Sequence, residues 1–441
     1  MGKKKRKINE LAQHKLQLAQ IRNEFKRRLK WFCSVIDREA LYSLLPERII
    51  EELFCMRGGT VIVTAAKGYC VPKGILNIFK IAFNRYLKDN QIKILKNGTD
   101  ISLHDYFNIA LPLQLYFNAI PDEWFPEAKE VKNGLSEYAS FQERDTQVIS
   151  DMMKVVERFA FIQSDFNNSF YQATYTIERI DKSISDMKLQ SIIEIKSYKP
   201  EKRQILADDA RRSAVRIGWS YTKSIHWLKI KPSQLDLPGT FSDIPLDVYI
   251  QQHALDRLHE RIGGRYNGMM HMDLYFSLLK PQAILSDKKH FLLTYYIFGL
   301  KAGYLLAEIT DGVILIRTFL FVTHSGTPEG KKLMNVTGLG KLDQKYLAFD
   351  SLANLANSDI LSNEQAKEIF YKADCREVLE LCGRIRNVSE FWILSENEQP
   401  LASRLLNYIR INQDSWNWDE PESPPSIVKA INNKEMEMVL D

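Results

Sequence analysis

The spacing of apolar residues divides the chain into regions that favour helices and regions that favour strands. Apolar residues recur at helical spacing through residues 8–30. Residues 134–185 contain almost no Gly or Pro and carry a heavy apolar stripe, which predicts two long helices with a bend near Asn167. Between these regions, two short apolar runs flank Asn97-Gly98, which is typical of a hairpin.

The C-terminal half changes from helical to strand-like spacing. Residues 251–262 and 273–280 predict two helices. The runs that follow predict four strands, at Phe291–Phe298, Tyr304–Ile309, Val313–Thr323 and Lys331–Thr337. Asp311-Gly312 is a tight turn between two of them, so we expect an antiparallel sheet. The predicted fold class is α+β: a mostly helical N-terminal region, two helices packed on a four-stranded antiparallel sheet, then C-terminal helices.

A chain of 441 residues is long enough for two or three domains, and the Pro-rich stretch 232–245 is a candidate boundary. The predicted division has five parts. They are a basic N-terminal helix with a small α+β region (1–130), a long-helix region with a basic, aromatic segment (131–231), a small α+β domain (245–340), C-terminal helices (341–411) and a mobile acidic tail (412–441).

Composition indicates a folded protein, because 45% of the residues are hydrophobic and 11% are aromatic. We expect no membrane span, since apolar runs are too short, and the MGKKKRK start lacks the apolar core of a secretory signal. The five cysteines form no CxxC pair, so neither a zinc site nor a disulfide framework is indicated. We expect a cytoplasmic protein without a cofactor.

The net charge of +5 is unevenly distributed. Residues 1–30 hold eleven basic and two acidic residues, an excess of nine, so the rest of the chain carries a net charge of −4. This arm, with Lys26, Arg27 and Arg28 at its end, could bind RNA or another polyanion by releasing counterions. The alternatives are a solubilising tail or a nuclear address.

A second basic stretch, residues 196–231, interleaves cations with aromatic residues. Arg211, Arg212 and Trp219 are its candidates for RNA contacts, because bases stack on rings while the backbone follows cations. The alternative is an ordinary charged helix followed by a strand with buried aromatics.

Residues 251–262, with the sequence QQHALDRLHERI, are the strongest candidate for chemistry. Wound as a helix, the segment places apolar residues on one face, namely Leu255, Leu258 and Ile262. It places three polar residues on the opposite face at i, i+4 and i+8, namely His253, Arg257 and Arg261. An imidazole can exchange a proton near neutral pH, and guanidinium groups can grip phosphate oxygens. The alternative is an amphipathic helix with a solvated outer face.

The segment HALDRLHERI, followed by a helix and strands, resembles the HAxxRxxER opening of small domains in the barnase/RelE-like superfamily of metal-independent ribonucleases. Many of these domains are toxins or defence effectors. The resemblance covers about residues 248–340. It implies cleavage of RNA by attack of the ribose 2′-hydroxyl on the adjacent phosphate, which requires a base, an acid and cations on the phosphoryl oxygens.

The resemblance implies roles for particular residues. His253 would be the base or the acid, and Arg257 and Arg261 would stabilise the pentavalent phosphorane. His324, just after the longest strand, is the first choice for the partner of His253. Further phosphate contacts would come from three later residues, namely Thr337, Lys341 and Lys345. The alternatives are that His324 is a turn residue and Thr337 an ordinary strand threonine.

Five of the eight histidines lie between positions 250 and 330, but no HExxH or comparable cluster appears, so we expect no metal site. The functional hypothesis is a metal-independent endoribonuclease effector, of toxin or antiviral defence type, regulated by its N-terminal region. Its expected partners are RNA and an inhibitor or sensor. The alternative is a non-enzymatic RNA-binding or protein-interaction protein.

Overall fold

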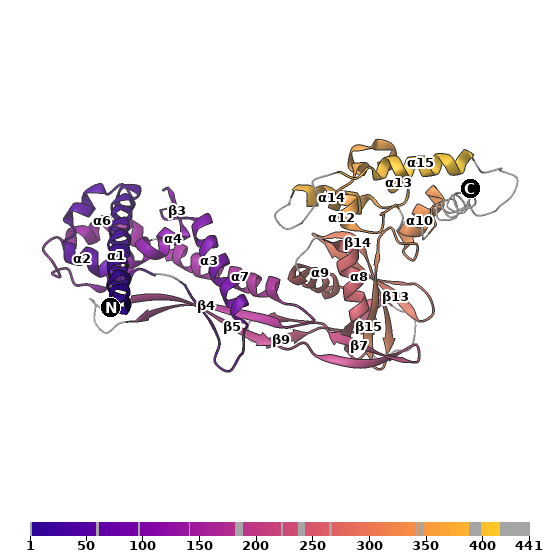
Figure 1. Cartoon of the computed structure of the whole chain (residues 1–441), viewed down its shortest axis with the longest axis horizontal. Helices are drawn as coiled ribbons and strands as arrows, with labels where there is room; N and C mark the ends of the chain where they lie inside the picture. The colour runs from indigo at the N-terminus through magenta and orange to yellow at the C-terminus, as the bar shows by residue number, and fades with distance from the viewer. Residues whose placement is uncertain are drawn as a thin grey trace. The chain divides into compact units, whose positions relative to one another are not determined.

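The computed structural model describes residues 2–58, 61–95, 98–140, 142–180, 188–221, 224–236, 243–263, 267–340, 343, 347–387 and 398–414. The chain forms two compact units (Figure 1). Unit 1 consists of residues 1–160 and 171–197, and unit 2 of residues 161–170 and 198–441. Both units contain helices and strands, which confirms the mixed α and β class predicted from the sequence.

Unit 1 is mostly helical. Its helical elements are α1 (Gly2–Val35), the 3-10 helix η1 (Glu39–Leu44), α2 (Glu47–Met56), α3 (Lys73–Asp89), α4 (Leu103–Asp105), the π-helix η2 (Tyr106–Ala110), α5 (Leu111–Ala119), α6 (Ala128–Ser140) and α7 (Gln142–Gln163), whose last residues belong to unit 2. Its strands are β1 (Ile62–Ala65), β2 (Gln91–Lys93), β3 (Asp100–Ser102), β4 (Phe170–Ile180) and β5 (Lys188–Tyr198). Strands β2 and β3 pair antiparallel, so the hairpin prediction is confirmed.

The prediction of helix across the whole of 134–185 is wrong in its second half. Helix α7 ends at Gln163, and β4 follows in a three-stranded sheet of order β1-β5-β4. In β4, Tyr171, Ala173 and Tyr175 are buried in the core of unit 1, at the period of two that a strand requires. The helical stripe of α7 therefore stops where the spacing of buried residues changes from about 3.6 to 2.

Unit 2 is built on a large sheet. Its strands are β6 (Lys202–Ala207), β7 (Ala210–Arg216), β8 (Gly218–Tyr221), β9 (Ser224–Trp227), β10 (Lys229–Ile230), β11 (Leu246–Gln251), β12 (Ala283–Leu285), β13 (His290–Ile297), β14 (Leu300–Thr310) and β15 (Val313–Phe321). Its helical elements are η4 (Pro232–Leu235), α8 (Gln252–Ile262), α9 (Asn267–Leu279), α10 (Pro328–Thr337), α12 (Leu352–Ala356), η5 (Asp359–Ser362), α13 (Glu364–Lys372), α14 (Arg376–Asn387) and α15 (Leu401–Asp414).

The main sheet has the order β12-β13-β14-β15-β11-β7-β6, with β10 also paired to β11. Two-residue turns at positive φ connect its hairpins: Asp208-Asp209, Phe298-Gly299 and Asp311-Gly312. Such turns match the twist of antiparallel strands, and the turn predicted at Asp311-Gly312 is confirmed. The exception to the antiparallel pattern is the pair β11 and β15, which is parallel.

One core runs through unit 2. The buried face of α8 and the apolar side of α9 pack on one face of the sheet (Figure 1), and the same cluster of buried residues continues into α12, α13, α14 and α15. Residues 245–340 and 341–411, predicted as separate segments, therefore share this core. Helix α15 extends to Asp414, and residues 415–441 of the predicted tail lie outside the described residues.

Three sequence predictions for unit 2 are wrong. The basic stretch after residue 196 forms the hairpin β6–β7 rather than a helix, because Asp208 and Asp209 adopt the left-handed conformation that a tight turn needs. Residues 331–337 lie in α10 and not in a fourth strand. The sheet is therefore larger than four strands and not wholly antiparallel.

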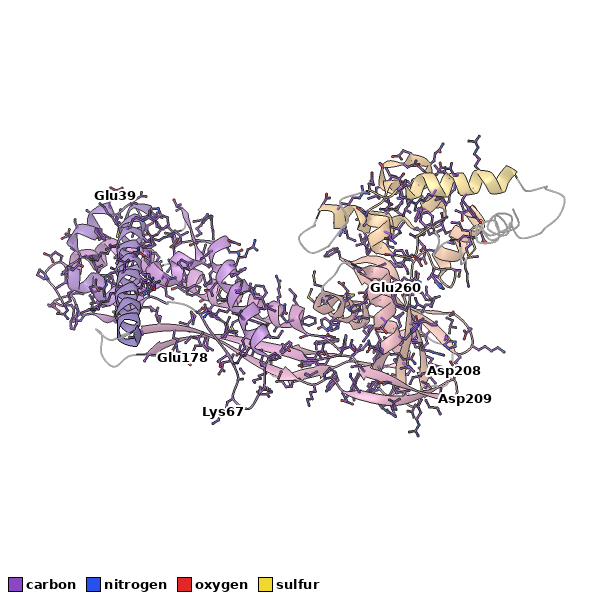
Figure 2. All side chains as sticks on the ribbon, viewed as in Figure 1. Glu39, Lys67, Glu178, Asp208, Asp209 and Glu260 are labelled. Carbon is purple, nitrogen blue, oxygen red and sulfur yellow. The ribbon has the colours of Figure 1, made fainter. Side chains whose placement is uncertain are left out.

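Asp208 and Asp209 form the β6–β7 turn (Figure 2), and ion pairs of Asp208 connect this turn to the sheet. The Asp208 carboxylate accepts hydrogen bonds from Lys289 and Arg317, which lower the pKa of Asp208 to about 2. Both cations also pair with Glu308, a fully buried carboxylate on β14, at 2.8 Å from Lys289 and 3.3 Å from Arg317. Arg317 is the extra residue of a β-bulge between β14 and β15, and the bulge directs its side chain to this cluster.

A buried histidine makes the stability of unit 2 depend on pH. His271 on α9 is 6% exposed, its ring centroid lies 3.9 Å from that of Phe166, and its Nδ1 has no hydrogen-bond partner among the described residues. Burial lowers the pKa of His271 to about 3. Below pH ~6.5 the unfolded chain takes up a proton that the folded chain cannot hold, so stability falls as the pH falls from ~6.5 toward 3.

We predict that His271→Leu flattens this pH dependence. One unperturbed histidine contributes at most about 1.4 kcal/mol of stability per pH unit. Between pH 6.5 and 5, urea unfolding of the wild type should lose roughly 2 kcal/mol more than unfolding of the variant. His253→Leu, at an exposed position, is the control and should keep the wild-type slope. Equal slopes for the wild type and His271→Leu would contradict the prediction.

Candidate functional site

A pocket of about 280 Å³ in unit 2 brings together most of the residues predicted to carry chemistry. Three segments line it: the polar face of α8, the end of β15 with the turn after it, and the turn before α12. The lining residues are His253, Arg257, Arg261, Thr318, Phe319, Leu320, Phe321, His324 and Asp350.

The parallel pair of strands explains where this pocket lies. Strand β11 pairs with β15 only from Val248↔Ile314 to Ile250↔Ile316, and then runs directly into α8. Strand β15 continues to Phe321, so its last residues extend beyond the end of β11. The first turns of α8 and the end of β15 thus meet at the carboxyl ends of two parallel strands, where ligand sites of open α/β sheets are commonly found.

The two faces of α8 follow the prediction. Four residues are buried in the core of unit 2, namely Ala254, Leu255, Leu258 and Ile262. His253 is exposed in the first helical turn, and Arg257 and Arg261 follow it along the pocket side. No hydrogen bond of the His253 side chain occurs among the described residues. Its imidazole is therefore available to a ligand in the pocket.

The two arginines differ in their partners. Arg257 donates to Glu260 at 2.5 Å, and both side chains are well exposed (Glu260 is labelled in Figure 2). An exposed pair of this kind contributes about 1 kcal/mol or less, so an anionic ligand can replace Glu260.

Arg261 is much less exposed, at 13% of its side chain, and its pairing is with Asp350. It donates to the Asp350 carbonyl oxygen at 3.1 Å and forms an ion pair with the same residue's carboxylate. Burial lowers the pKa of Arg261. This guanidinium connects α8 to the turn before α12, so it is better placed to hold the wall of the pocket than to grip a phosphate.

His324 lies in a turn that is fixed by the hydrogen bonds of two buried threonine hydroxyl groups. Thr323 donates to the Phe349 carbonyl oxygen at 2.6 Å, and Thr327 donates to that of Val322 at 2.6 Å. Both threonines are fully buried. The Gly326 N–H donates to Nδ1 of His324 at 2.9 Å. Because Nδ1 accepts this bond, the neutral ring carries its proton on Nε2.

Thr337 is not part of this pocket. It lies in the last turn of α10, is 5% exposed, and its hydroxyl donates to the Leu333 carbonyl oxygen at 2.6 Å. Thr337 is thus a helical residue rather than the end of a fourth strand, and this pocket does not support its predicted phosphate contact. The sequence Thr327-Pro328-Glu329 is typical of a helix N-terminus, with a capping residue, a proline at the first position and an acidic residue in the first turn. In the structure the Thr327 hydroxyl accepts a hydrogen bond from Gly330 N–H and caps α10.

The predicted RNA contacts do not gather at the pocket. The Trp219 side chain is 9% exposed and packs against Tyr275, with ring centroids 3.6 Å apart, so it cannot stack on a base. Arg211 and Arg212 are exposed on β7 and form no ion pair among the described residues. Lys341 and Lys345 lie outside the described residues.

The basic residues predicted at the end of the N-terminal arm belong to α1 in unit 1 and already have acidic partners. Lys26 pairs with Glu47, Arg27 with Glu24, and Arg28 with both Glu24 and the buried Asp105. Their charges are largely compensated, which weakens the case for a polyanion site at these three positions.

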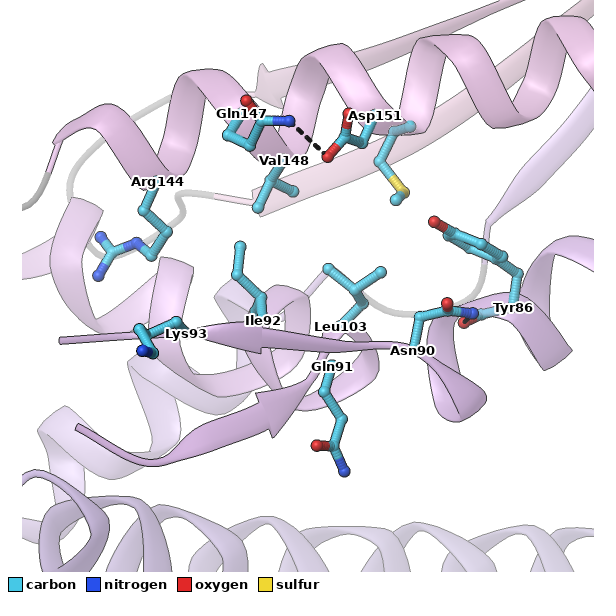
Figure 3. A pocket seen from close by; sticks show the side chains of 11 residues that line it. Tyr86, Asn90, Gln91, Ile92, Lys93, Leu103, Arg144, Gln147, Val148 and Asp151 are labelled. Carbon is cyan, nitrogen blue, oxygen red and sulfur yellow. Dashed lines mark hydrogen bonds between the residues drawn. The ribbon is translucent and has the colours of Figure 1, made fainter. Parts of the chain in front are cut away.

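Unit 1 holds a larger cavity of about 500 Å³ between the β2–β3 hairpin and α7 (Figure 3). Gln147 and Asp151 line it and are hydrogen-bonded to each other at 2.7 Å. Arg144, at one end, has a fully buried side chain that donates to four acceptors, those of Asp145, Gln114, Ile94 and Tyr138. The bonds of Arg144 stabilise the fold of unit 1. Lys93 and Asp151 also line this cavity, but no histidine does, whereas two histidines line the pocket of unit 2.

No group of three or more His, Cys, Asp or Glu side chains in the described ranges is arranged to hold a metal ion. Within the same ranges, no helix has the length and apolar character needed to cross a bilayer. Comparison of the chain with protein-family models, curated protein sequences and solved structures finds no match.

We predict that Gly330→Ala disturbs the turn that holds His324. A Cβ atom at Gly330 would lie 1.9 Å from the His324 carbonyl oxygen, a backbone atom that cannot move aside without moving the turn. We expect a loss of about 1–3 kcal/mol in urea unfolding. Gly383→Ala, within α14, is the matched control: nothing lies within 4 Å of its added Cβ, so it should be neutral or stabilising. Equal stability of the two variants would contradict this packing.

Proposed function

We propose that the pocket of unit 2 cleaves RNA, as a metal-independent endoribonuclease in which the 2′-hydroxyl attacks the adjacent phosphate. The observation that supports this best is that two imidazoles from distant parts of the chain, His253 and His324, line one pocket with Arg257. Acid–base chemistry on a phosphodiester needs this combination of two proton carriers and a cation.

In the proposed reaction, His253 accepts the proton of the 2′-hydroxyl. The 2′-oxygen then forms a bond to phosphorus, and the bond from phosphorus to the 5′-oxygen breaks. His324, in its imidazolium form, gives the Nε2 proton to that leaving oxygen, which departs protonated, and the ring becomes neutral. The products are a 2′,3′-cyclic phosphate and a 5′-hydroxyl end.

The cations have different parts in this proposal. Arg257 exchanges its Glu260 partner for a phosphoryl oxygen and stabilises the negative charge that develops there. Arg261 is a positioning residue, because its ion pair with Asp350 fixes the wall of the pocket. Full transfer of a proton from His324 requires the imidazolium form, in which Nδ1 no longer accepts from Gly326.

The pairing of both arginines with carboxylates favours a second candidate, a module that binds RNA or another partner without cleaving it. In that case the His253 side chain would add little to affinity. We further propose, from the resemblance of HALDRLHERI to ribonuclease toxin domains, that the protein is a toxin or defence effector acting in the cytoplasm, with unit 1 as its regulatory part.

The test is cleavage of total RNA by the purified full-length protein in EDTA, with 2′,3′-cyclic phosphate ends as the readout. His253→Ala should lower the rate roughly 10²–10⁴-fold, because it removes the proposed base. Arg257→Ala should lower it at least tenfold through lost charge stabilisation.

Arg384→Ala is the matched control, since Arg384 forms the same kind of exposed helical pair, with Glu380 on α14, and does not line the pocket. It should cleave at the wild-type rate. If the wild type and His253→Ala bind RNA equally and neither cleaves it, the proposal of an enzyme is contradicted, and the second candidate, a binding module, takes its place.

A further inference from the structure

A separate cavity in unit 1 has the features of a binding site for a small anion. Its volume is about 420 Å³. Its apolar lining residues are Ile21, Phe25 and Ile109, and its polar ones are Glu24, Arg28, Arg57, His104, Asp105 and Asn108. This cavity is distinct from the pocket of unit 2, to which the proposed function belongs.

Arg57 is a cation without a counter-ion. It follows the last residue of α2, its guanidinium carbon lies 3.6 Å from the centroid of the Phe54 ring, and it donates to the Phe54 carbonyl oxygen. Among the described residues it forms no ion pair. A guanidinium has five N–H donors, so most of them are left for the cavity. Burial lowers the pKa of Arg57, the mark of a charge that would gain from an anionic partner.

Two carboxylates, Glu24 and Asp105, also line this cavity, and two arginines balance them: Arg28, which lines it too, and Arg27, which pairs with Glu24. Arg28 pairs with Glu24 at 3.1 Å and with Asp105 at 2.5 Å, and Asp105 is 4% exposed. His104 lies 3.8 Å from the same Asp105 carboxylate. Arg27, Arg28 and Arg57 together carry one positive charge more than Glu24 and Asp105, and Arg57 is the one of the three arginines that forms no ion pair among the described residues. A ligand with one anionic group would pair with it.

The wall that carries Asn108 and Ile109 is a π-helical turn, Tyr106–Ala110. Such turns are rare and occur frequently at functional sites. This observation is independent of the charge argument, and it indicates the same cavity.

The apolar residues of the cavity indicate the chemistry of the part of the ligand that does not contact Arg57. Ile21 is 48% exposed at the cavity, and Leu18, one turn earlier on α1, is 38% exposed. From Ile21 to Phe25, which both line the cavity, the helix rises about 6 Å, since each residue adds 1.5 Å, and Leu18 extends the apolar stripe beyond the cavity to about 10 Å. An apolar stripe of this length suits a medium-chain alkyl group.

We propose that the cavity binds a small amphipathic anion, with a carboxylate or phosphate head on Arg57 and an alkyl chain along Phe25 and Ile21. The guanidinium fork matches either head in two parallel hydrogen bonds. The apolar chain gains affinity by leaving water.

Calorimetric titration of the full-length protein tests this with four probes: octanoate, octyl phosphate, octanol and acetate. We expect at least one of the two charged octyl probes to bind. Octanol lacks the anionic head and acetate lacks the alkyl chain, so each should bind at least tenfold more weakly. The ratio of the dissociation constants of octanoate and octyl phosphate shows whether the site prefers a carboxylate or a phosphate head group. No binding of either charged octyl probe, or octanol as tight as both, would overturn the proposal.

Arg57→Gln should weaken the charged octyl probe at least tenfold and leave octanol unchanged. Arg48→Gln is the matched control. Arg48, on α2, also lies over an aromatic ring, 5.5 Å from the centroid of Trp124, but it pairs with Glu52 and does not line the cavity. It should bind as the wild type does.

Arg57 also bonds the end of α2, so a second variant separates binding from folding. Ile21→Glu places a carboxylate at an exposed position of the cavity and should weaken the anion at least tenfold. Leu16→Glu, on α1 at 61% exposure and outside the cavity, is its control. Wild-type affinity in both Arg57→Gln and Ile21→Glu would exclude this cavity as the site.

Discussion

The parallel pairing of β11 with β15 is the constraint on which the candidate site depends. Because β11 ends at Gln251 and enters α8 without a loop, the first turn of α8 must start beside β15. Because β15 runs on to Phe321, the chain that follows it returns along the same end of the sheet. His253 and His324 come together through this topology, and neither would line the pocket if β15 ended level with β11.

The site also depends on two kinds of rigid support. The apolar face of α8 is buried, which fixes the direction of its polar face. The turn at His324 is fixed by buried hydroxyls at Thr323 and Thr327 and by the close approach of Gly330. These supports give the two imidazoles different states: one is exposed in a helical turn, and the other is held as the Nε2–H form by Gly326. The Gly326 bond describes the neutral ring of His324, which must gain a proton before it can act as the acid.

The sequence predicted the parts of this site that depend on local periodicity and missed those that depend on tertiary contacts. The stripe of His253, Arg257 and Arg261 was readable, because buried and exposed positions alternate at helical spacing in α8. Asp350 gave no local signal, since it reaches the site only through its pairing with Arg261. Thr337 was misplaced because an apolar run of this length fits a strand or a short helix equally well. Trp219 was taken for a stacking platform, but its exposure is decided by Tyr275 on α9.

The central claim is that the pocket of unit 2 receives a phosphodiester between His253 and His324. The most direct measurement is a long-range ¹H–¹⁵N spectrum of the full-length protein with ¹⁵N-labelled histidine, recorded while a 2′-deoxy dinucleotide, which cannot be cleaved, is added. The account predicts that His324 is in the Nε2–H form and that the ring signals of His253 and His324 both move, while those of the buried His271 stay in place. Ring signals of His253 and His324 that do not move at millimolar dinucleotide would contradict it.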